Sequence, residues 1–306
     1  MSSAHTLSAP PIGQHEPVLS PVGQSYFQVS WRRLRRNHVA MLALIFLAII
    51  CLIALTAPWT TSNILHHDPN RGRLTQRLQS PSGQHLLGTD DLGRDVAARL
   101  ISAGRVSLAI GFMVAAISLT LGVSLGLLAG FYGRWVDDAI NAVIQVTLNI
   151  PALFILILLS VLFRPTVPLL ALFFGLLGWP GTARQVRGRV LSERGRDYVT
   201  AARVAGARDW RTMYRHILPN VSSVVLVIAG CDIGGAILGE AGLSALGFGV
   251  QIPTASWGNM LSKSLELFDR AWWLVVSPGV AIIVTVFCVF LLADALRDAL
   301  DPRATH

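Results

Sequence analysis

The side chains that could carry out catalysis are few in this chain of 306 residues. The single lysine, Lys263, follows Ser262 rather than a glycine, so the Gly-Lys-Ser/Thr sequence of a phosphate-binding loop is absent. The segment that contains Gly242, Ser244 and Gly247 has one residue too many for the Gly-x-Ser-x-Gly turn of a serine hydrolase. No His-Glu-x-x-His zinc motif occurs either. We therefore predict that the chain is not an enzyme and carries no cofactor of its own.

Metal-ligating side chains are also sparse. His66, His67 and Asp68 are consecutive, but adjacent residues are poor joint ligands, and no further cluster lies near them in the sequence. Each cysteine lies in an apolar run, outside any Cys-x-x-Cys pair; these are Cys51, Cys231 and Cys288. The sequence therefore predicts neither a metal site nor a disulfide.

Two carboxylates remain as candidates. Asp232 is the only acid near the middle of a long apolar stretch, where a charge is costly and often functional. It either lines a path for a solute and meets an amine or cation, or is hydrogen-bonded to backbone or to a neighbouring helix. Glu240 stands near the end of the same stretch. It could lie at the external mouth of such a path, but a solvated helix end is the favoured interpretation.

The elements that must position these residues are membrane helices. Hydrophobic residues make up 53% of the chain and charged residues only 14%, against about 25% charged residues in ordinary soluble domains. A helix needs about 20 apolar residues to cross a bilayer. The sequence predicts an all-α polytopic membrane protein with six transmembrane helices, the third kinked at Pro151. These predicted spans cover about 38–59, 105–131, 138–163, 167–183, 220–240 and 272–293.

The remaining segments complete the predicted organisation. Residues 1–37 form a disordered tail followed by a basic amphipathic segment, in which arginines and aromatic residues interleave from Tyr26 to Asn37 and would contact membrane lipid. Residues 60–104 form an extracytoplasmic loop. Residues 105–298 form a core of five helices with a cytoplasmic loop at 184–218, and 299–306 form a cytoplasmic tail.

The distribution of cations predicts the orientation. Of the 25 cations, 16 fall in segments on the side of the termini and nine on the other side. Cytoplasmic loops carry an excess of Lys and Arg, so both termini are predicted to lie in the cytoplasm of a bacterium, with the chain in its inner membrane.

The loop at 184–218 is the most basic part of the chain, and residues 196–220 within it have a helix–turn–helix pattern. Asp197 and Asp209 are placed to cap two helices, Gly206 to end the first, and Pro219 to end the unit and open the fifth span. The second helix repeats large apolar side chains at helical spacing, namely Trp210, Met213, Tyr214 and Ile217. One bulky apolar face of this kind either docks in a groove of another protein or packs on the protein's own membrane helices.

The same segment resembles the "EAA" loop of ABC importer permeases. The matching residues are Ala201, Ala202, Gly206, Ile217, Leu218 and Pro219, while Thr200 stands where that family has Glu. Residues 85–108, 241–261 and 291–302 resemble blocks of the dipeptide/oligopeptide/nickel group, C-subunit type, with Ala293 and Ala295 in place of usual glycines. The resemblance runs from about residue 30 to 302.

This resemblance implies a permease subunit that forms half of a channel for di- or oligopeptides. It implies as partners a second homologous permease, one or two ABC ATPase subunits that bind ATP and Mg²⁺, and an extracytoplasmic solute-binding protein. The loop at 184–218 would be the coupling element that contacts the ATPase. Nickel, a metal chelate or a glutathione-like solute is the alternative substrate. No nucleic-acid partner is expected.

Two further interpretations stay open at this point. Gly122, Gly126 and Gly130 allow close helix approach, either to the second permease or within this chain. Gly230, Gly234, Gly235 and Gly239 have similar spacing and favour a surface that lines the pore or faces a partner. A stand-alone secondary transporter or channel, or a membrane scaffold, is the alternative of another class, although paired intramembrane charges and internal repeats are absent from the sequence.

Overall fold

The computed structural model describes residues 26–300, and within that range the chain is helical without a single strand. Five helices are long and apolar enough to span a membrane, and a bent pair brings the number to six. The all-α membrane fold is therefore confirmed, with the predicted six spans if the bent pair counts as one span. The five are α2 (His38–Leu55), α4 (Val96–Tyr132), α7 (Val167–Glu193), α10 (Leu218–Ala245) and α12 (Trp273–Leu300), and the pair is α5 (Arg134–Asn149) with α6 (Ala152–Phe163).

Several helices extend beyond the predicted spans. α4 begins at Val96 rather than near 105, because Asp95 caps it: one oxygen of the Asp95 carboxyl accepts the Ala98 N–H at 2.8 Å. α7 continues beyond 183 as far as Glu193. The predicted third span is not a single kinked helix, since α5 and α6 meet at an angle of 76°. Pro151 lies at that break and provides no N–H to continue the helix.

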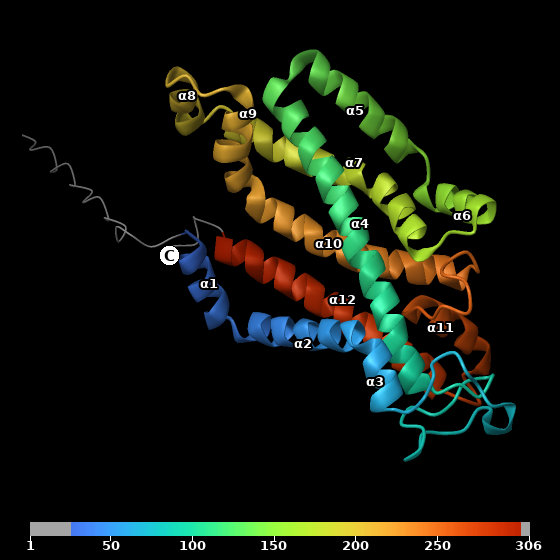
Figure 1. The fold of residues 1–306 in the computed structure, drawn as a ribbon. Coiled ribbons are helices and arrows are strands. Elements are labelled where there is room, and N and C mark those ends of the chain that lie inside the picture. Colours follow the sequence, from blue (N-terminus) through green and yellow to red (C-terminus); the bar gives the residue numbers. More distant parts are fainter. Residues whose placement is uncertain (1–25, 301–306) are drawn as a thin grey trace, which may run out of the picture.

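The helices form a bundle with α4 running its length between the other long helices (Figure 1). Gly122, Gly126 and Gly130 face α7, where added Cβ atoms would come within 2.5–2.7 Å of Thr182, Ala183 and Val190. These glycines therefore serve packing within this chain. Of the four glycines of α10 that the sequence argument singled out, Gly230, Gly234 and Gly239 are likewise enclosed, against Ala293, Phe290 and Phe174, whereas Gly235 has open space beside it. Their predicted role on a pore-lining or partner-facing surface is thus wrong for these three.

The short elements lie at the two ends of this bundle (Figure 1). One end carries α8 (Asp197–Val204) and α9 (Asp209–Arg211), near α1 (Tyr26–Arg36) and the C-terminal end of α12. The other end carries α3 (Ala57–Asn63), η1 (Leu74–Gln76), α11 (Trp257–Ser264) and η3 (Leu265–Leu267).

The amphipathic helix α1 rests on the bundle through one side. Leu34 is buried against Ala295 and Ala299 of α12, whereas Trp31, which Arg35 covers at 5.9 Å, is half exposed. The predicted disordered tail and the last six residues lie outside the described part of the chain.

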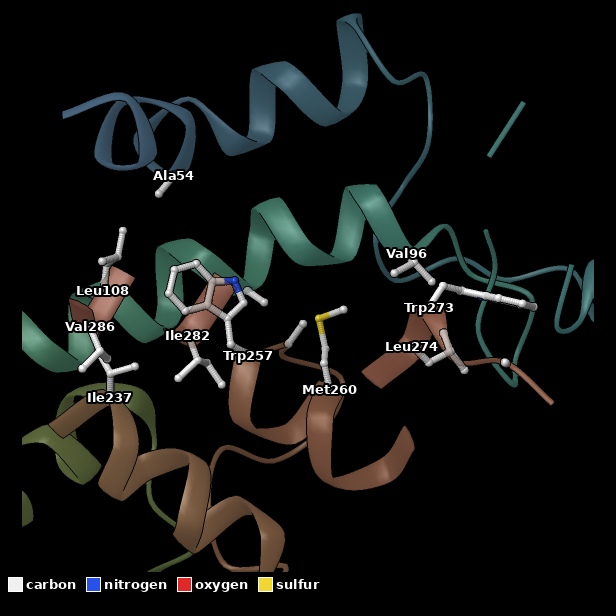
Figure 2. Close-up of a cluster of buried hydrophobic side chains, with 13 residues drawn as sticks. Ala54, Val96, Leu108, Ile237, Trp257, Met260, Trp273, Leu274, Ile282 and Val286 are labelled. Carbon is white, nitrogen blue, oxygen red and sulfur yellow. The ribbon is translucent and has the colours of Figure 1, made fainter. Parts of the chain in front are cut away.

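Buried tryptophans fasten α11 to α4 and α12 to the loop that precedes α4. Figure 2 shows Trp257 in the middle of a cluster to which α2, α4, α10, α11 and α12 contribute. The Trp257 indole N–H donates to the Leu100 carbonyl at 3.1 Å, and the Trp273 indole N–H donates to the Thr89 carbonyl at 3.3 Å. The end of the bundle with α11 is therefore tied together by groups from distant parts of the sequence.

Candidate functional site

The predicted helix–turn–helix is present in the segment 196–220. α8 ends before Gly206, which has φ +80°, and the Gly206 and Ala207 N–H groups donate to the carbonyls of Arg203 and Ala202. This left-handed turn is the one that glycine favours after a helix. A Cβ added at Gly206 would meet no atom within 4 Å, so only the backbone conformation restricts the residue type there.

Three predicted details of this segment are wrong. The helices begin at Asp197 and Asp209 themselves, after Arg196 and Arg208, so neither acid caps a helix through its side chain. Pro219 opens the fifth span as predicted, in the first turn of α10, but it does not end the second helix, because the chain is helical without a break from Asp209 to Ala245. The π-helical turn η2 (Thr212–Ile217) just before Pro219 shifts the hydrogen-bond register, an adjustment that accommodates proline in membrane helices.

The large apolar side chains do not share one face. Met213 and Ile217 are buried, while Trp210 is 62% exposed and Tyr214 is 50% exposed. Val204, which the sequence argument did not single out, is 85% exposed. Each of the two interpretations of the apolar face thus holds for two of its four residues. Met213 and Ile217 pack on the protein's own helices, whereas Trp210 and Tyr214 remain exposed.

The motif residues with small side chains lie mostly at the surface. Thr200 is exposed, and its hydroxyl bonds only the Arg196 carbonyl of its own helix, at 3.4 Å. Ala201 and Pro219 are exposed, and Ala202 and Leu218 are half-buried.

An apolar cluster anchors the segment 196–220 on the long helices. Val199 of α8 packs with Met213 and Ile217 of η2, against residues of α4, α7 and α10. The partners are Leu127, Phe131, Val186, Val190, Val221 and Ile228. Burying these side chains fixes the position of α8 and η2 on the ends of the long helices.

Polar contacts that sequence reasoning missed hold α8 to the end of α7. Glu193 is 2% exposed; its carboxyl accepts from the Tyr198 hydroxyl at 3.0 Å and pairs with Arg196 at 3.1 Å. Burial, followed by the hydrogen bond to Glu193, raises the pKa of the Tyr198 phenol to about 12. Arg203 lies 4.8 Å from the ring centre of Phe131 in α4. The sequence did contain a signal for these contacts, namely the short spacing of Glu193, Arg196 and Tyr198.

Asp232 lies within α10, and its carboxyl faces a neighbouring helix. The Thr182 hydroxyl of α7 approaches the Asp232 carboxyl at 3.4 Å and is within 3.0 Å of the Ser118 hydroxyl of α4. Ser118 and Thr182 are buried, whereas Asp232 is only half-buried. Hydrogen bonding to a neighbouring helix is thus present, and one side of Asp232 remains open.

Glu240 is not a solvated helix end. It is 0% exposed, and one oxygen of its carboxyl accepts from the Ser244 hydroxyl at 2.6 Å and the Ser256 hydroxyl at 2.7 Å. The loop that leads into α11 folds back over Glu240, and Gly258 permits the approach, since a Cβ there would lie 2.6 Å from Ala241 Cα. Glu240 therefore fastens this loop and lines no open path in this structure.

The three consecutive ligand-type residues do not act together. His66 bonds the Ser62 carbonyl and Asp68 pairs with Arg71. His67 instead approaches His85 and Asp95, which come from later in the chain. Spacing along the sequence gave no signal for this group.

Comparison with known proteins identifies the family. Residues 122–306 match the model described as binding-protein-dependent transport system inner membrane component, and residues 25–81 match the N-terminal TM domain of oligopeptide transport permease C. The chain is 40% identical over 298 residues to the dipeptide transport system permease protein DppC of Escherichia coli, covering 95% of this chain and 98% of that protein. It is 36% identical over 304 residues to a DppC of Alkalihalophilus pseudofirmus, covering 97% of this chain and 98% of that protein.

Solved structures agree on the fold. A chain of the MetNI methionine ABC transporter, in inward-facing conformations, matches with a TM-score of 0.53 and 18% identity, over 66% of this chain and 96% of that chain. By family model, by relatives along its whole length and by fold, this chain belongs to the family of binding-protein-dependent transport system inner membrane components, the permease subunits of ABC importers.

Proposed function

We propose that this permease forms half of the channel of a peptide importer, and that an ATPase subunit docks on Val204, Trp210 and Tyr214. We call these three side chains the docking surface. The observation that carries the proposal is their exposure, at 85%, 62% and 50%, on a segment whose other side is buried. ATP and Mg²⁺ would be bound by the partner, so this chain needs no cofactor.

The docking surface has the properties of a protein contact. Exposed aromatic side chains next to an anchored backbone contribute strongly to binding, because little side-chain freedom is lost when the partner arrives. Val199, Met213 and Ile217 provide that anchor. Movement of a docked ATPase would therefore be transmitted to α10, which continues from η2 without a break.

The complete importer would contain a second homologous permease, one or two ATPase subunits and an extracytoplasmic solute-binding protein. Dipeptides and oligopeptides are the proposed substrates, supported by relatives named for dipeptide, di/tripeptide and oligopeptide transport. The alternative substrate remains nickel, a metal chelate or a glutathione-like solute. Growth of a deletion strain, auxotrophic for one amino acid, on peptides containing it distinguishes these substrates; growth on the free amino acid is the control.

Both termini are proposed to be cytoplasmic, in the bacterial inner membrane. Support comes from the nine arginines of residues 184–218 and from the position of α1, α8 and the end of α12 at one end of the bundle (Figure 1). Reporter fusions should place residues 64–95 outside and residues 196–217 inside. Fusions that place residues 196–217 outside would contradict both the orientation and the docking proposal.

Trp210→Ala tests the docking surface. We expect the variant to reach the membrane and to lose about 2 kcal/mol of ATPase binding, because a central aromatic contact is removed without a backbone change. The measurements are co-purification of the ATPase and substrate-stimulated ATP hydrolysis. Trp59→Ala is the matched control, since Trp59 is 60% exposed and lies in α3 at the other end. If both variants retain the ATPase equally well, the docking proposal is contradicted.

Asp232 is proposed to line the translocation path. The half-buried carboxyl has one open side among membrane helices, where a peptide amine or cation could meet it. Asp232→Asn keeps the size of the side chain and removes its charge. We expect assembly with the partners to be unchanged and transport to fall. Normal transport by the assembled variant would show that hydrogen bonding to α7 is the whole role of Asp232.

A further inference from the structure

A group of metal-ligating side chains lies at the end of the bundle opposite the docking surface. His67 follows α3, His85 lies in the loop between the first two spans, and Asp95 precedes α4. His85 Nδ1 is 2.9 Å and His67 Nε2 is 4.0 Å from the same oxygen of Asp95, Oδ2. The two imidazole rings are stacked with centres 4.9 Å apart. One ligand atom of each of the three residues lies within 4.8 Å of the others.

We propose that His67, His85 and Asp95 bind one divalent transition-metal ion, of which Zn²⁺ is the representative. Two imidazole nitrogens and one carboxylate oxygen are a donor set that such ions prefer, and three protein ligands leave a fourth position for water. Ligand atoms of a tetrahedral site with bonds of about 2.0–2.2 Å lie roughly 3.4 Å apart. His85 Nδ1 and Asp95 Oδ2, now at the 2.9 Å of a hydrogen bond, need to separate by about 0.5 Å as the ion takes the place of the proton between them. His67 needs to move in by about 1 Å.

The surroundings of the three ligands suit this role. The other oxygen of Asp95 accepts the Ala98 N–H, which orients the carboxyl in the way that outer contacts orient metal ligands. His67 Nε2 lies 3.0 Å from the Gln84 carbonyl, a hydrogen bond that the ion would replace, with the ring bound as the neutral tautomer that carries its proton on Nδ1. His85 and Asp95 are buried, which protects the ligands from competing water.

An ion can reach the ligands from outside. A cavity of about 760 Å³ is lined by His67, His85 and Asp95, and the His67 side chain is 34% exposed. Arg71 and Arg73 also line this cavity, and Asp68 pairs with Arg71 at 3.5 Å. A bound ion would join residue 67 to residue 95, and so fasten the loop between the first two spans onto the first turn of α4.

Metal titration of the purified full-length importer complex, stripped with a chelator, tests the proposal. We expect wild type to bind one more Zn²⁺ per permease than His67→Ala and Asp95→Asn, measured by calorimetry and by elemental analysis after gel filtration. Asparagine keeps the capping oxygen for Ala98, so Asp95→Asn removes the ligand and retains the start of α4. His66→Ala is the control, because His66 is adjacent in sequence and bonds only the Ser62 carbonyl. It should bind Zn²⁺ as wild type does.

A second measurement reports on the loop. Zn²⁺ should raise the midpoint of thermal unfolding of wild type and of His66→Ala, and leave that of His67→Ala unchanged, because the ion binds only the folded site. His67→Ala decides the question if Asp95→Asn assembles poorly. Equal Zn²⁺ stoichiometry and equal thermal shifts in wild type and His67→Ala would overturn the proposal. Uptake of peptides is not needed for either readout, so the result is independent of the proposed function.

Discussion

The two ends of the bundle hold their surface segments by different means. At the end with α8, the segment rests on apolar contacts of Val199, Met213 and Ile217. At the end with α11, fully or nearly fully buried polar groups such as Glu240 and Asp95 connect loops to helices. A buried polar group is costly when it loses its partner, whereas the exposed apolar side chains of the docking surface can be removed with little effect on the fold. Substitutions at the two ends should therefore have different effects. At the end with α11 they should destabilise the folded protein, and at the end with α8 they should impair coupling to the ATPase.

The largest effect is expected at Gly258, in the loop over Glu240. In Gly258→Ala, the added Cβ would lie 2.6 Å from Ala241 Cα and 2.7 Å from the Glu240 carboxyl. Separating these groups opens the hydrogen bond between Glu240 and Ser256, so we expect a loss of about 3 kcal/mol of folding free energy. Thermal unfolding of the purified protein in detergent measures the change.

Gly242→Ala is the matched control for that substitution. Gly242 lies near the same end of α10, and a Cβ added there meets no atom within 4 Å. Its unfolding midpoint should equal that of wild type. If Gly258→Ala melts as wild type does, the buried carboxyl network does not limit the stability of this end.

Gly206→Val should have a smaller effect on stability and a large effect on coupling. Gly206 has φ +80°, a conformation that costs a β-branched residue about 1–3 kcal/mol, and no atom lies near enough to clash. The strain would redirect the second helix and with it Trp210. We expect normal insertion in the membrane and loss of ATPase stimulation, measured as substrate-dependent ATP hydrolysis.

Gly195→Val controls for the added side chain. Gly195 is exposed, lies in the same segment, and has free space around the position of a Cβ without a positive φ. It should stimulate the ATPase as wild type does. Loss of stimulation in both variants would mean that bulk, and not the left-handed turn, accounts for the result.

The same contrast explains what the sequence could and could not predict. Helix periodicity and the position of Gly206 are local, so the helix–turn–helix and its left-handed turn were predictable from neighbouring residues. The exposure of Trp210 and Tyr214, against the burial of Met213, depends on how the segment lies on α4 and α7, and spacing alone does not contain that information. Glu240 was misjudged because the loop that covers it comes from later in the chain.

The smallest effect is expected at Tyr198, which makes a polar contact at the end with α8, where apolar contacts otherwise hold the segment. Its hydroxyl donates to the Glu193 carboxyl at 3.0 Å, and Tyr198→Phe removes this bond while the ring stays in place. The side chain is only half-buried, so the loss should be about 1 kcal/mol and should leave ATPase association intact.

The pH dependence of Tyr198 provides a sharper test of the same contact. Burial and the bond to Glu193 raise the pKa of the phenol from 10.0 to about 12 in the folded protein. The folded state thus favours the protonated phenol; this stabilising contribution is fully present below pH 10 and is lost as the pH rises through about 12. Tyrosinate absorbance of wild type minus that of Tyr198→Phe isolates this group from the other three of the chain's four tyrosines. We expect a difference titration with a midpoint near pH 12. A midpoint near 10 would place Tyr198 in solvent, and its hydroxyl would then contribute nothing to holding α8 on the end of α7.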